Sequence, residues 1–252
     1  MRWSLVRHKP FMLATDLDGT FVGQEENLGA LLAHFDRLPH DVSLVYITGR
    51  HLSSAKSLIY SEKLPIPDLL VTDVGTAIYH HANVEDSQWA ERMSENWRPD
   101  EIISIAEDFP LLNRQALPDN RRISFTVPKG NSSLVEEFQN ALERQGITHT
   151  FIFSSDRDID VLPATAGKGK ALEYIFSNYT AKNVQALIAG DSGNDMDMLS
   201  LGYPSVIVGN AQPELIAMED HPNLYRAVAH CAGGILEAWL HFYGKEAEVV
   251  RT

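Results

Sequence analysis

Short, almost continuous apolar runs recur along the chain, and helical patterns separate most of them. The apolar runs cover residues 11–15, 42–47, 69–72, 184–189 and 205–208, and the helical patterns cover 28–38, 52–62 and 171–177. An apolar run of this length is typical of a strand that is buried on both faces of a parallel sheet. Strands that alternate with helices predict an α/β fold with a doubly wound, Rossmann-like parallel sheet.

The pattern changes between about residues 80 and 163. Helical patterns at 88–97, 100–107 and 132–144 are mixed with strand patterns at 122–127, 149–153 and 158–162. This mixture indicates an α+β unit inserted into the α/β unit. The α/β pattern resumes at 167–170 and ends in a helix over 233–242. We therefore expect a core of residues 1–80 and 163–252 and a cap of residues 81–162.

Polar or glycine-rich clusters follow four of these segments, at 16–20, 48–50, 73–76 and 190–195. In open α/β sheets, ligands bind outside the carboxyl ends of the strands. The sequence therefore predicts that its chemistry is gathered at one edge of the sheet.

Two carboxylates, Asp16 and Asp18, lie on the first of these loops. They could supply a nucleophile and the acid that assists the leaving group, although an ordinary acidic turn is the competing interpretation. Asp191 and Asp195 in the last loop could complete an oxygen-rich magnesium site, or could cap the helix expected over 194–201. An isolated Lys168 near a helix start could equally be a solvated surface charge.

The chain is acidic, with 34 Asp and Glu against 21 Lys and Arg and a formal net charge of -13. This charge argues against nucleic acid and anionic membranes as partners. A phosphate anion could bind only with the help of a divalent cation and a few placed Lys or Arg side chains.

The single cysteine, Cys231, excludes an internal disulfide. There is no apolar run of about 20 residues, and residues 1–10 lack the apolar stretch of a signal peptide. A cytoplasmic location is therefore expected.

Four strings, in this order, resemble the four motifs of the haloacid dehalogenase phosphatase superfamily: Asp16-Leu17-Asp18-Gly19-Thr20, Thr48-Gly49-Arg50, Lys168-Gly169 and Gly190-Asp191-Ser192-Gly193-Asn194-Asp195. The resemblance spans almost the whole chain, and the inserted segment resembles the large α/β cap of the sugar-phosphate branch. Three longer strings are similar to the sucrose-phosphate phosphatase family: VGTAIYH at 74–80, FSSDRDIDVLP at 153–163 and GNAQPEL at 209–215. The similarity is weaker over 83–120 and before the first strand.

The resemblance implies that Asp16 attacks phosphorus. Asp18 would protonate the leaving oxygen and then activate water. Mg²⁺ would be held by the carboxylates of Asp16 and Asp191 and by the backbone carbonyl of Asp18. We expect folding to bring the carboxylates of Asp16, Asp18 and Asp191 around one cation, within reach of the Lys168 ammonium.

Phosphoryl oxygens would be bound, by the same resemblance, at Thr48, Gly49, Lys168 and Asn194. Asp195 would orient Lys168 or a metal-bound water, with simple capping as its alternative role. Sugar recognition is expected where the cap faces the core. The candidates are Arg50, His51, Arg122, Ser154, Asp158 and Asp160. Arg122 could instead point to solvent from its strand, and Asp158 and Asp160, which share one strand face, could simply be exposed.

The predicted activity is that of a phosphoric monoester hydrolase that converts sucrose 6-phosphate to sucrose and phosphate. Another disaccharide phosphate, such as mannosylfructose phosphate, or a monosaccharide phosphate is the alternative substrate, and a phosphomutase is a variant. A non-catalytic domain that binds a sugar or a glycosyltransferase is the alternative from a different class. A glycosyltransferase of the same pathway is an expected partner, and the chain is expected to be a monomer or a weak homo-oligomer. Residues 244–252 are predicted to be disordered.

Overall fold

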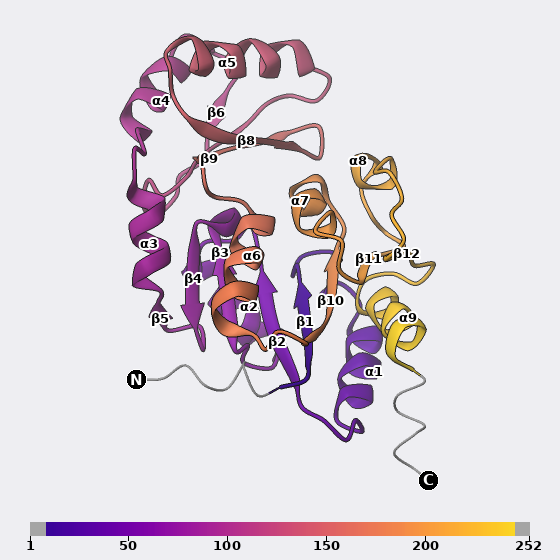
Figure 1. The fold of residues 1–252 in the computed structure, drawn as a ribbon. Helices are drawn as coiled ribbons and strands as arrows, with labels where there is room; N and C mark the ends of the chain where they lie inside the picture. Colours follow the sequence, from indigo (N-terminus) through magenta and orange to yellow (C-terminus); the bar gives the residue numbers. More distant parts are fainter. Residues whose placement is uncertain (1–8, 245–252) are drawn as a thin grey trace.

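The structure is a computed structural model that describes residues 9–244. The predictions for residues 1–8 and 245–252 concern segments outside the described residues. In the described part the chain forms a large mixed sheet with a smaller sheet above it (Figure 1).

The large sheet has the strand order β12-β11-β10-β1-β2-β3-β4-β5. Its strands are β1 Phe11–Thr15, β2 Val42–Ile47, β3 Leu69–Thr72, β4 Ala77–His80, β5 Val84–Glu85, β10 Gln185–Gly190, β11 Ser205–Ile207 and β12 Leu224–Arg226. The pairings from β12 to β3 are parallel, and β4 and β5 add antiparallel strands at one edge. The chain moves from β1 to β2 on one side and returns to β10 on the other, so the crevice of a doubly wound sheet lies beside β1.

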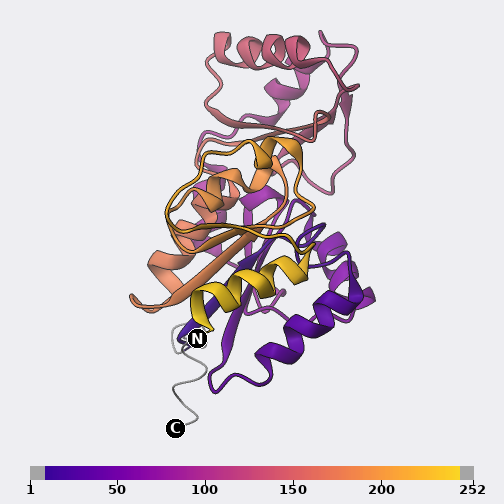
Figure 2. The same ribbon diagram turned by 90° about the vertical axis from the view of Figure 1, so that its right-hand side faces the viewer.

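Helices cover both faces of this sheet. Successive side chains of β1 point to opposite faces, and both sets are buried. Phe11 and Leu13 point to the face covered by α1 Glu25–Phe35, α2 Leu52–Ser61 and α9 Ala232–Tyr243. Met12 and Ala14 point to the face covered by α6 Lys168–Tyr179, α7 Met196–Leu199 and α8 Pro213–Ile216. Figure 2 shows α1 and α9 side by side on their face. The predicted fold class is confirmed.

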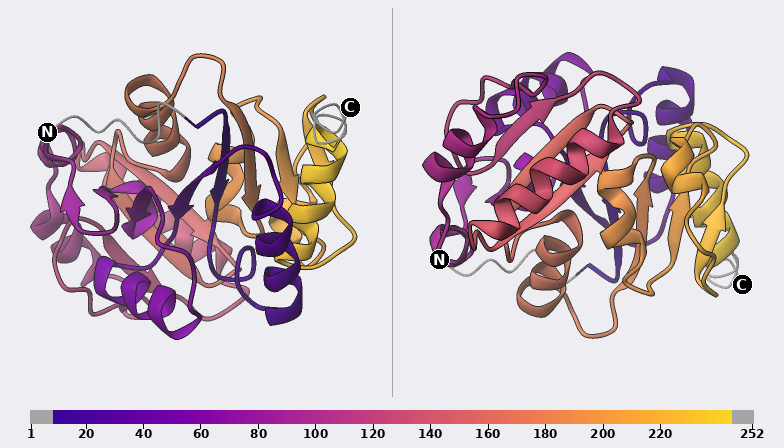
Figure 3. Two further views of the ribbon diagram at one scale, coloured as in Figure 1. Left: turned by 90° about the horizontal axis from the view of Figure 1, so that it is seen from below. Right: turned by 90° about the horizontal axis from the view of Figure 1, so that it is seen from above.

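The small antiparallel sheet has the order β6-β7-β9-β8, with β6 Asn113–Arg114, β7 Ile123–Thr126, β8 His149–Ser154 and β9 Asp158–Pro163. One face packs on α4 Pro99–Ala106 and α5 Ser132–Arg144 around the buried Phe125 and Phe138 (Figure 3). The other face looks toward the carboxyl ends of the large sheet's strands (Figure 1).

The helix α3 Ser87–Ser94 packs with the large sheet, because Trp89 and Met93 belong to its core. β5 also lies in that sheet. Both fall within the range predicted for the cap, and the boundaries 1–80, 81–162 and 163–252 stay a prediction.

The structure differs from the prediction in several local elements, and two of these follow β10 and β3. The helix expected over 194–201 is a 3₁₀ turn, η3 Gly193–Asp195, followed by the short α7. β4 was not predicted, because the turn that reverses the chain after β3 places two non-glycine residues, Asp73 and Val74, at φ 52 and 57. Among the described helices, none is long and apolar enough to cross a bilayer.

Candidate active site

Three carboxylates meet at the carboxyl ends of two neighbouring strands. Asp16 follows β1, Asp191 follows β10 and Asp195 closes η3, and one oxygen from each lies within 4.8 Å of the others. Lys168, the first residue of α6, places Nζ 2.6 Å from Oδ1 of Asp16 and 2.6 Å from Oδ1 of Asp195. The adjacency of β1 and β10 thus brings together residues that are far apart in the chain.

The cluster sets one ammonium among three carboxylates. All of these groups are buried, and burial shifts the pKa values of three of them. Burial raises the pKa of Asp16 well above its ordinary value, and Lys168 offsets part of this effect. Burial, followed by the neighbouring Asp195, raises the pKa of Asp191 to about 7. Burial lowers the pKa of Lys168, but Asp16 and Asp195 outweigh it, so that this pKa is raised. When these carboxylates are ionised, the cluster has three negative charges against one positive charge, and a cation would balance the excess.

The arrangement fits a hard divalent cation such as Mg²⁺. Both carboxylate oxygens of Asp195 already accept hydrogen bonds. Its Oδ2 accepts the backbone N–H groups of Asp191 and Ser192, and its Oδ1 accepts Lys168. Oδ1 of Asp191 accepts the Thr20 hydroxyl at 2.8 Å, and Oδ1 of Asp16 accepts Lys168. The second oxygens of Asp16 and Asp191 are thus the ones that a cation could take.

Asp195 makes contacts that suit both of its predicted roles. Its side chain forms a capping box with Ser192 at the start of η3 and also binds Lys168. Capping of η3 and orientation of Lys168 are therefore compatible at Asp195.

Asp18 lies apart from the other carboxylates. Its side chain is half exposed, at 51%, and Arg50 binds it through Nε–Oδ2 at 2.6 Å and Nη2–Oδ1 at 2.7 Å. The expectation that the carboxylates of Asp16, Asp18 and Asp191 surround one cation is therefore wrong for Asp18. The reason is that Arg50, on the loop after the neighbouring β2, offers Asp18 a bidentate partner. This pairing involves only the side chain of Asp18, so the binding of Mg²⁺ by its backbone carbonyl stays a prediction.

A cavity of about 500 Å³ lies between the two sheets and reaches Asp16 and Asp18. The core contributes Gly49, Arg50, His51, Ser192 and Asn194 to its lining. The cap contributes Arg122, Ser154, Asp158 and Asp160, so all six candidate sugar contacts line one cavity. Thr48 is buried beside it, and its Oγ1 accepts the backbone N–H of Arg50 at 3.1 Å.

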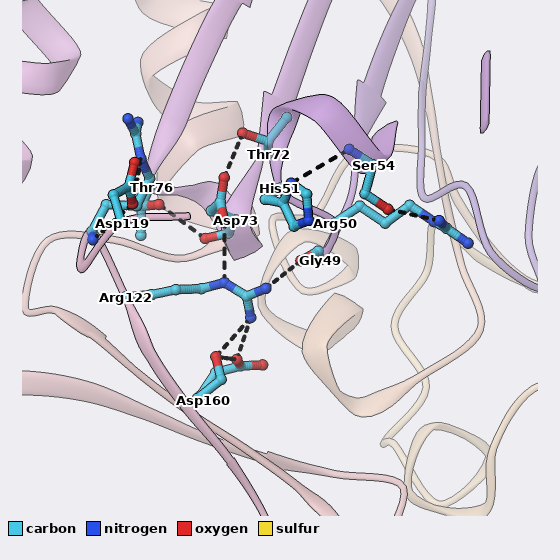
Figure 4. A network of polar contacts seen from close by, with 12 residues as sticks. Gly49, Arg50, His51, Ser54, Thr72, Asp73, Thr76, Asp119, Arg122 and Asp160 are labelled. Carbon is cyan, nitrogen blue, oxygen red and sulfur yellow. Dashed lines mark hydrogen bonds and ion pairs between the residues drawn. The ribbon is translucent and has the colours of Figure 1, made fainter. Parts of the chain in front are cut away.

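Arg122 is the centre of a buried polar network between cap and core (Figure 4). Its Nη1 donates to Ser124 and Asp160 within the cap. Its Nη2 donates to the carbonyl of Gly49 at 2.8 Å, and its Nε contacts Asp73 at 3.4 Å. The solvent-facing alternatives are thus wrong for Arg122 and Asp160, which are each 6% exposed.

Asp158 differs from Asp160 on the same strand, because it is partly exposed and pairs with Arg157 at 2.8 Å. It still lines the cavity. It therefore stays a candidate for a sugar contact.

Sequence reasoning missed several lining residues: Gln115, Ala116, Leu117, Ser155 and Arg157. The first three follow β6 within the segment where the family similarity is weak, and no pattern in their sequence marks them. Ser155 and Arg157 lie inside the string at 153–163 that carries the similarity, so they could have been named from it.

Comparisons with known proteins identify the family of this chain. The model of the sucrose-6F-phosphate phosphohydrolase family matches residues 9–243. The probable sucrose-phosphatase 2 of Arabidopsis thaliana is 34% identical over 249 residues, which cover 92% of this chain and 59% of that protein. The mannosylfructose-phosphate phosphatase of Agrobacterium fabrum is 28% identical over 238 residues, covering 92% of this chain and 96% of that protein. The chain thus spans about three fifths of the first plant relatives it matches.

Among solved structures, the sucrose-phosphatase from Synechocystis in complex with sucrose and phosphate superposes with a TM-score of 0.87. It is 36% identical in sequence, and the match covers 93% of this chain and 98% of that chain. A sugar phosphatase of haloacid dehalogenase subclass IIB superposes with a TM-score of 0.68 at 15% identity, which bears on the fold alone.

Proposed function

Because this chain belongs to the sucrose-6F-phosphate phosphohydrolase family, we propose that it is a magnesium-dependent phosphatase that hydrolyses sucrose 6-phosphate to sucrose and phosphate. The observation that carries the proposal is the buried cluster of Asp16, Asp191, Asp195 and Lys168 beneath a cavity lined by polar groups of the cap. A buried nucleophile below a polar cavity suits a substrate with an anionic end and a hydroxyl-rich end.

Asp16 is the proposed nucleophile. Its carboxylate oxygen attacks phosphorus and the bond from phosphorus to the sugar oxygen breaks, which leaves a phosphoaspartate. Lys168 holds one oxygen of Asp16 at 2.6 Å and is itself fixed by Asp195, so the attacking group is oriented before the substrate arrives.

Asp18 is the proposed acid and base. It gives a proton to the leaving sugar oxygen, and later takes a proton from the water that attacks the phosphoaspartate and releases phosphate. It lines the cavity beside Asp16, and Arg50 fixes its direction. The same carboxylate would serve in both half-reactions.

The residues that would hold Mg²⁺ are Asp16 and Asp191, through their carboxylates, and Asp18, through its backbone carbonyl. When bound, the cation would balance the excess negative charge of the site and shield the phosphate from the nucleophile. Phosphoryl oxygens would be bound by the Thr48 hydroxyl, whose oxygen already accepts a backbone N–H, and by Gly49, Lys168 and Asn194.

A second disaccharide phosphate is the alternative substrate, favoured by the similarity to the mannosylfructose-phosphate phosphatase. Sugar specificity would come from the six candidates that line the cavity: Arg50, His51, Arg122, Ser154, Asp158 and Asp160. The predicted glycosyltransferase partner, the oligomeric state and the cytoplasmic location stay predictions.

The test is a substrate panel. We expect kcat/KM for sucrose 6-phosphate to exceed that for mannosylfructose phosphate, fructose 6-phosphate and glucose 6-phosphate. A flat profile would reject the sucrose assignment, and a maximum at mannosylfructose phosphate would favour the alternative. A non-catalytic domain would release no phosphate from any of them.

A further inference from the structure

The string GNAQPEL, residues 209–215, lies after β11 and beside the site, and we call it the strap. Its alternate residues, Asn210, Gln212 and Glu214, bind the loops around the site. Nδ2 of Asn210 donates to the carbonyl of Gly19 at 2.7 Å, and the backbone N–H of Gln212 donates to the carbonyl of Asp191 at 2.7 Å. The strap thus connects the loop that follows Asp16 with the loop of Asp191.

Glu214 extends this chain of contacts to the cap. Its Oε1 accepts the backbone N–H of Gly193 at 3.3 Å and the backbone N–H of Ser155 at 2.8 Å. Gly193 belongs to the core, and Ser155 lies in the turn between β8 and β9 of the cap. A single carboxylate oxygen therefore joins loops of the two sheets.

The contact is tightly packed around Gly193. A Cβ at this position would lie 3.0 Å from Cγ of Glu214 and 3.4 Å from Cβ of Ser154. The added Cβ would thus be tight against Glu214, and it would also be in van der Waals contact with Ser154 of the cap. Ser192, Ser154 and Ser155 line the cavity at this point.

A second contact between cap and core involves the same cavity, because Arg122 of the cap donates to the carbonyl of Gly49 in the core and both residues line it. Glu214 and Arg122 therefore join the cap to the core at two different places. We propose that Glu214 is a positioning residue that sets the Ser154–Ser155 turn over the loop of Asp191 and so adjusts the sugar-facing lining to the phosphoryl site. This inference rests on the proposed phosphatase function.

The kinetic test uses Glu214→Ala and Glu214→Gln, with the exposed Glu219→Ala of the same segment as control. The substrates are the sugar phosphate that the wild-type protein hydrolyses best and 4-nitrophenyl phosphate, which has no sugar to contact the cap. Glu214→Ala is expected to lower kcat/KM for the sugar phosphate about 10-fold or more, mainly through KM. The value for 4-nitrophenyl phosphate should change less than about 2-fold.

Glu214→Gln keeps one acceptor oxygen and should restore part of the lost kcat/KM. Glu219→Ala should match the wild type with both substrates. Equal losses with both substrates, or no loss with either, would overturn the proposal, because Glu214 would then only support loop folding or do nothing.

Backbone hydrogen exchange supplies a readout that needs no substrate. Glu214→Ala should speed the exchange of the Ser155 and Gly193 amides, while Glu219→Ala leaves both unchanged. Unchanged exchange at Ser155 in Glu214→Ala would overturn the inference. A wild-type protein that hydrolyses no phosphate ester would instead refute the proposed function, so the two failures are distinct.

Discussion

The guanidinium of Arg50 binds both carboxylate oxygens of Asp18, at 2.6 and 2.7 Å. Two parallel hydrogen bonds fix the direction of a carboxylate as well as its distance, which a lysine ammonium cannot do. Arg50 therefore holds the proposed acid and base at the cavity that Asp16 also lines.

Replacing Arg50 tests this orientation. We expect Arg50→Lys to lower kcat about 10-fold, because Asp18 loses its fixed direction while a positive charge remains. Arg98→Lys is the matched control, since Arg98 also binds a carboxylate, that of Glu101, through Nε and Nη2 but lies on the surface of the cap. A kcat for Arg50→Lys equal to that of the control would show that Asp18 needs no such partner.

Magnesium should stabilise the protein more as the pH rises. The pKa of Asp191 is raised to about 7 in the folded chain, whereas a carboxylate in the unfolded chain titrates near about 4. The folded protein thus holds this proton more tightly, and without a cation its stability falls as the pH rises from about 4 to about 7. Because the cation needs the ionised carboxylate, its binding strengthens over the same range.

Thermal unfolding with EDTA and with excess Mg²⁺ checks this linkage. The increase in Tm caused by Mg²⁺ should be larger at about pH 8 than at about pH 6, which lie on either side of the pKa of Asp191. Asp191→Asn should remove most of the increase at both pH values. An increase that does not depend on pH in the wild-type protein would contradict the assignment of Asp191.

Gly75 sets the position of Lys168. It has φ +93, and a Cβ there would lie 2.3 Å from the carbonyl oxygen of Gly167 and 2.9 Å from the backbone nitrogen of Lys168. Gly75→Ala should therefore lower the free energy of unfolding and reduce kcat by displacing Lys168.

Gly202→Ala is the control for Gly75→Ala, because Gly202 has φ +81 but no heavy atom within 4 Å of its added Cβ. The steric clash should make Gly75→Ala about 1–3 kcal/mol less stable than this control in urea unfolding. Equal destabilisation would mean that only the backbone conformation matters and that Lys168 is not displaced.

Much of the fold could be predicted from apolar runs, because strands buried on both faces, such as β1, leave an unmistakable pattern. β4 could not, since the turn before it depends on positive φ at Asp73 and Val74, which neither residue type announces. The gathering of Asp16, Asp191 and Asp195 followed from strand ends meeting at one edge, whereas Lys168, at the start of α6, was assigned to the site by the family resemblance alone.

The partners of individual side chains were harder to predict. Asp18 and Arg50 were each identified as candidates, but their pairing depends on the spacing between β1 and β2 rather than on either sequence motif. The strap was noticed as a string, yet Asn210 reaches a backbone carbonyl 191 residues away, and a contact to backbone leaves no signature in the partner's residue type.

Phosphate release by the wild-type protein and by Asp16→Asn tests the central claim most directly. With sucrose 6-phosphate and Mg²⁺, the wild-type protein should release phosphate, EDTA should abolish the release and Asp16→Asn should show at least about a 10³-fold lower rate while keeping a folded structure. Release by Asp16→Asn at the wild-type rate, or release that persists fully in EDTA, would contradict a magnesium-dependent attack by Asp16.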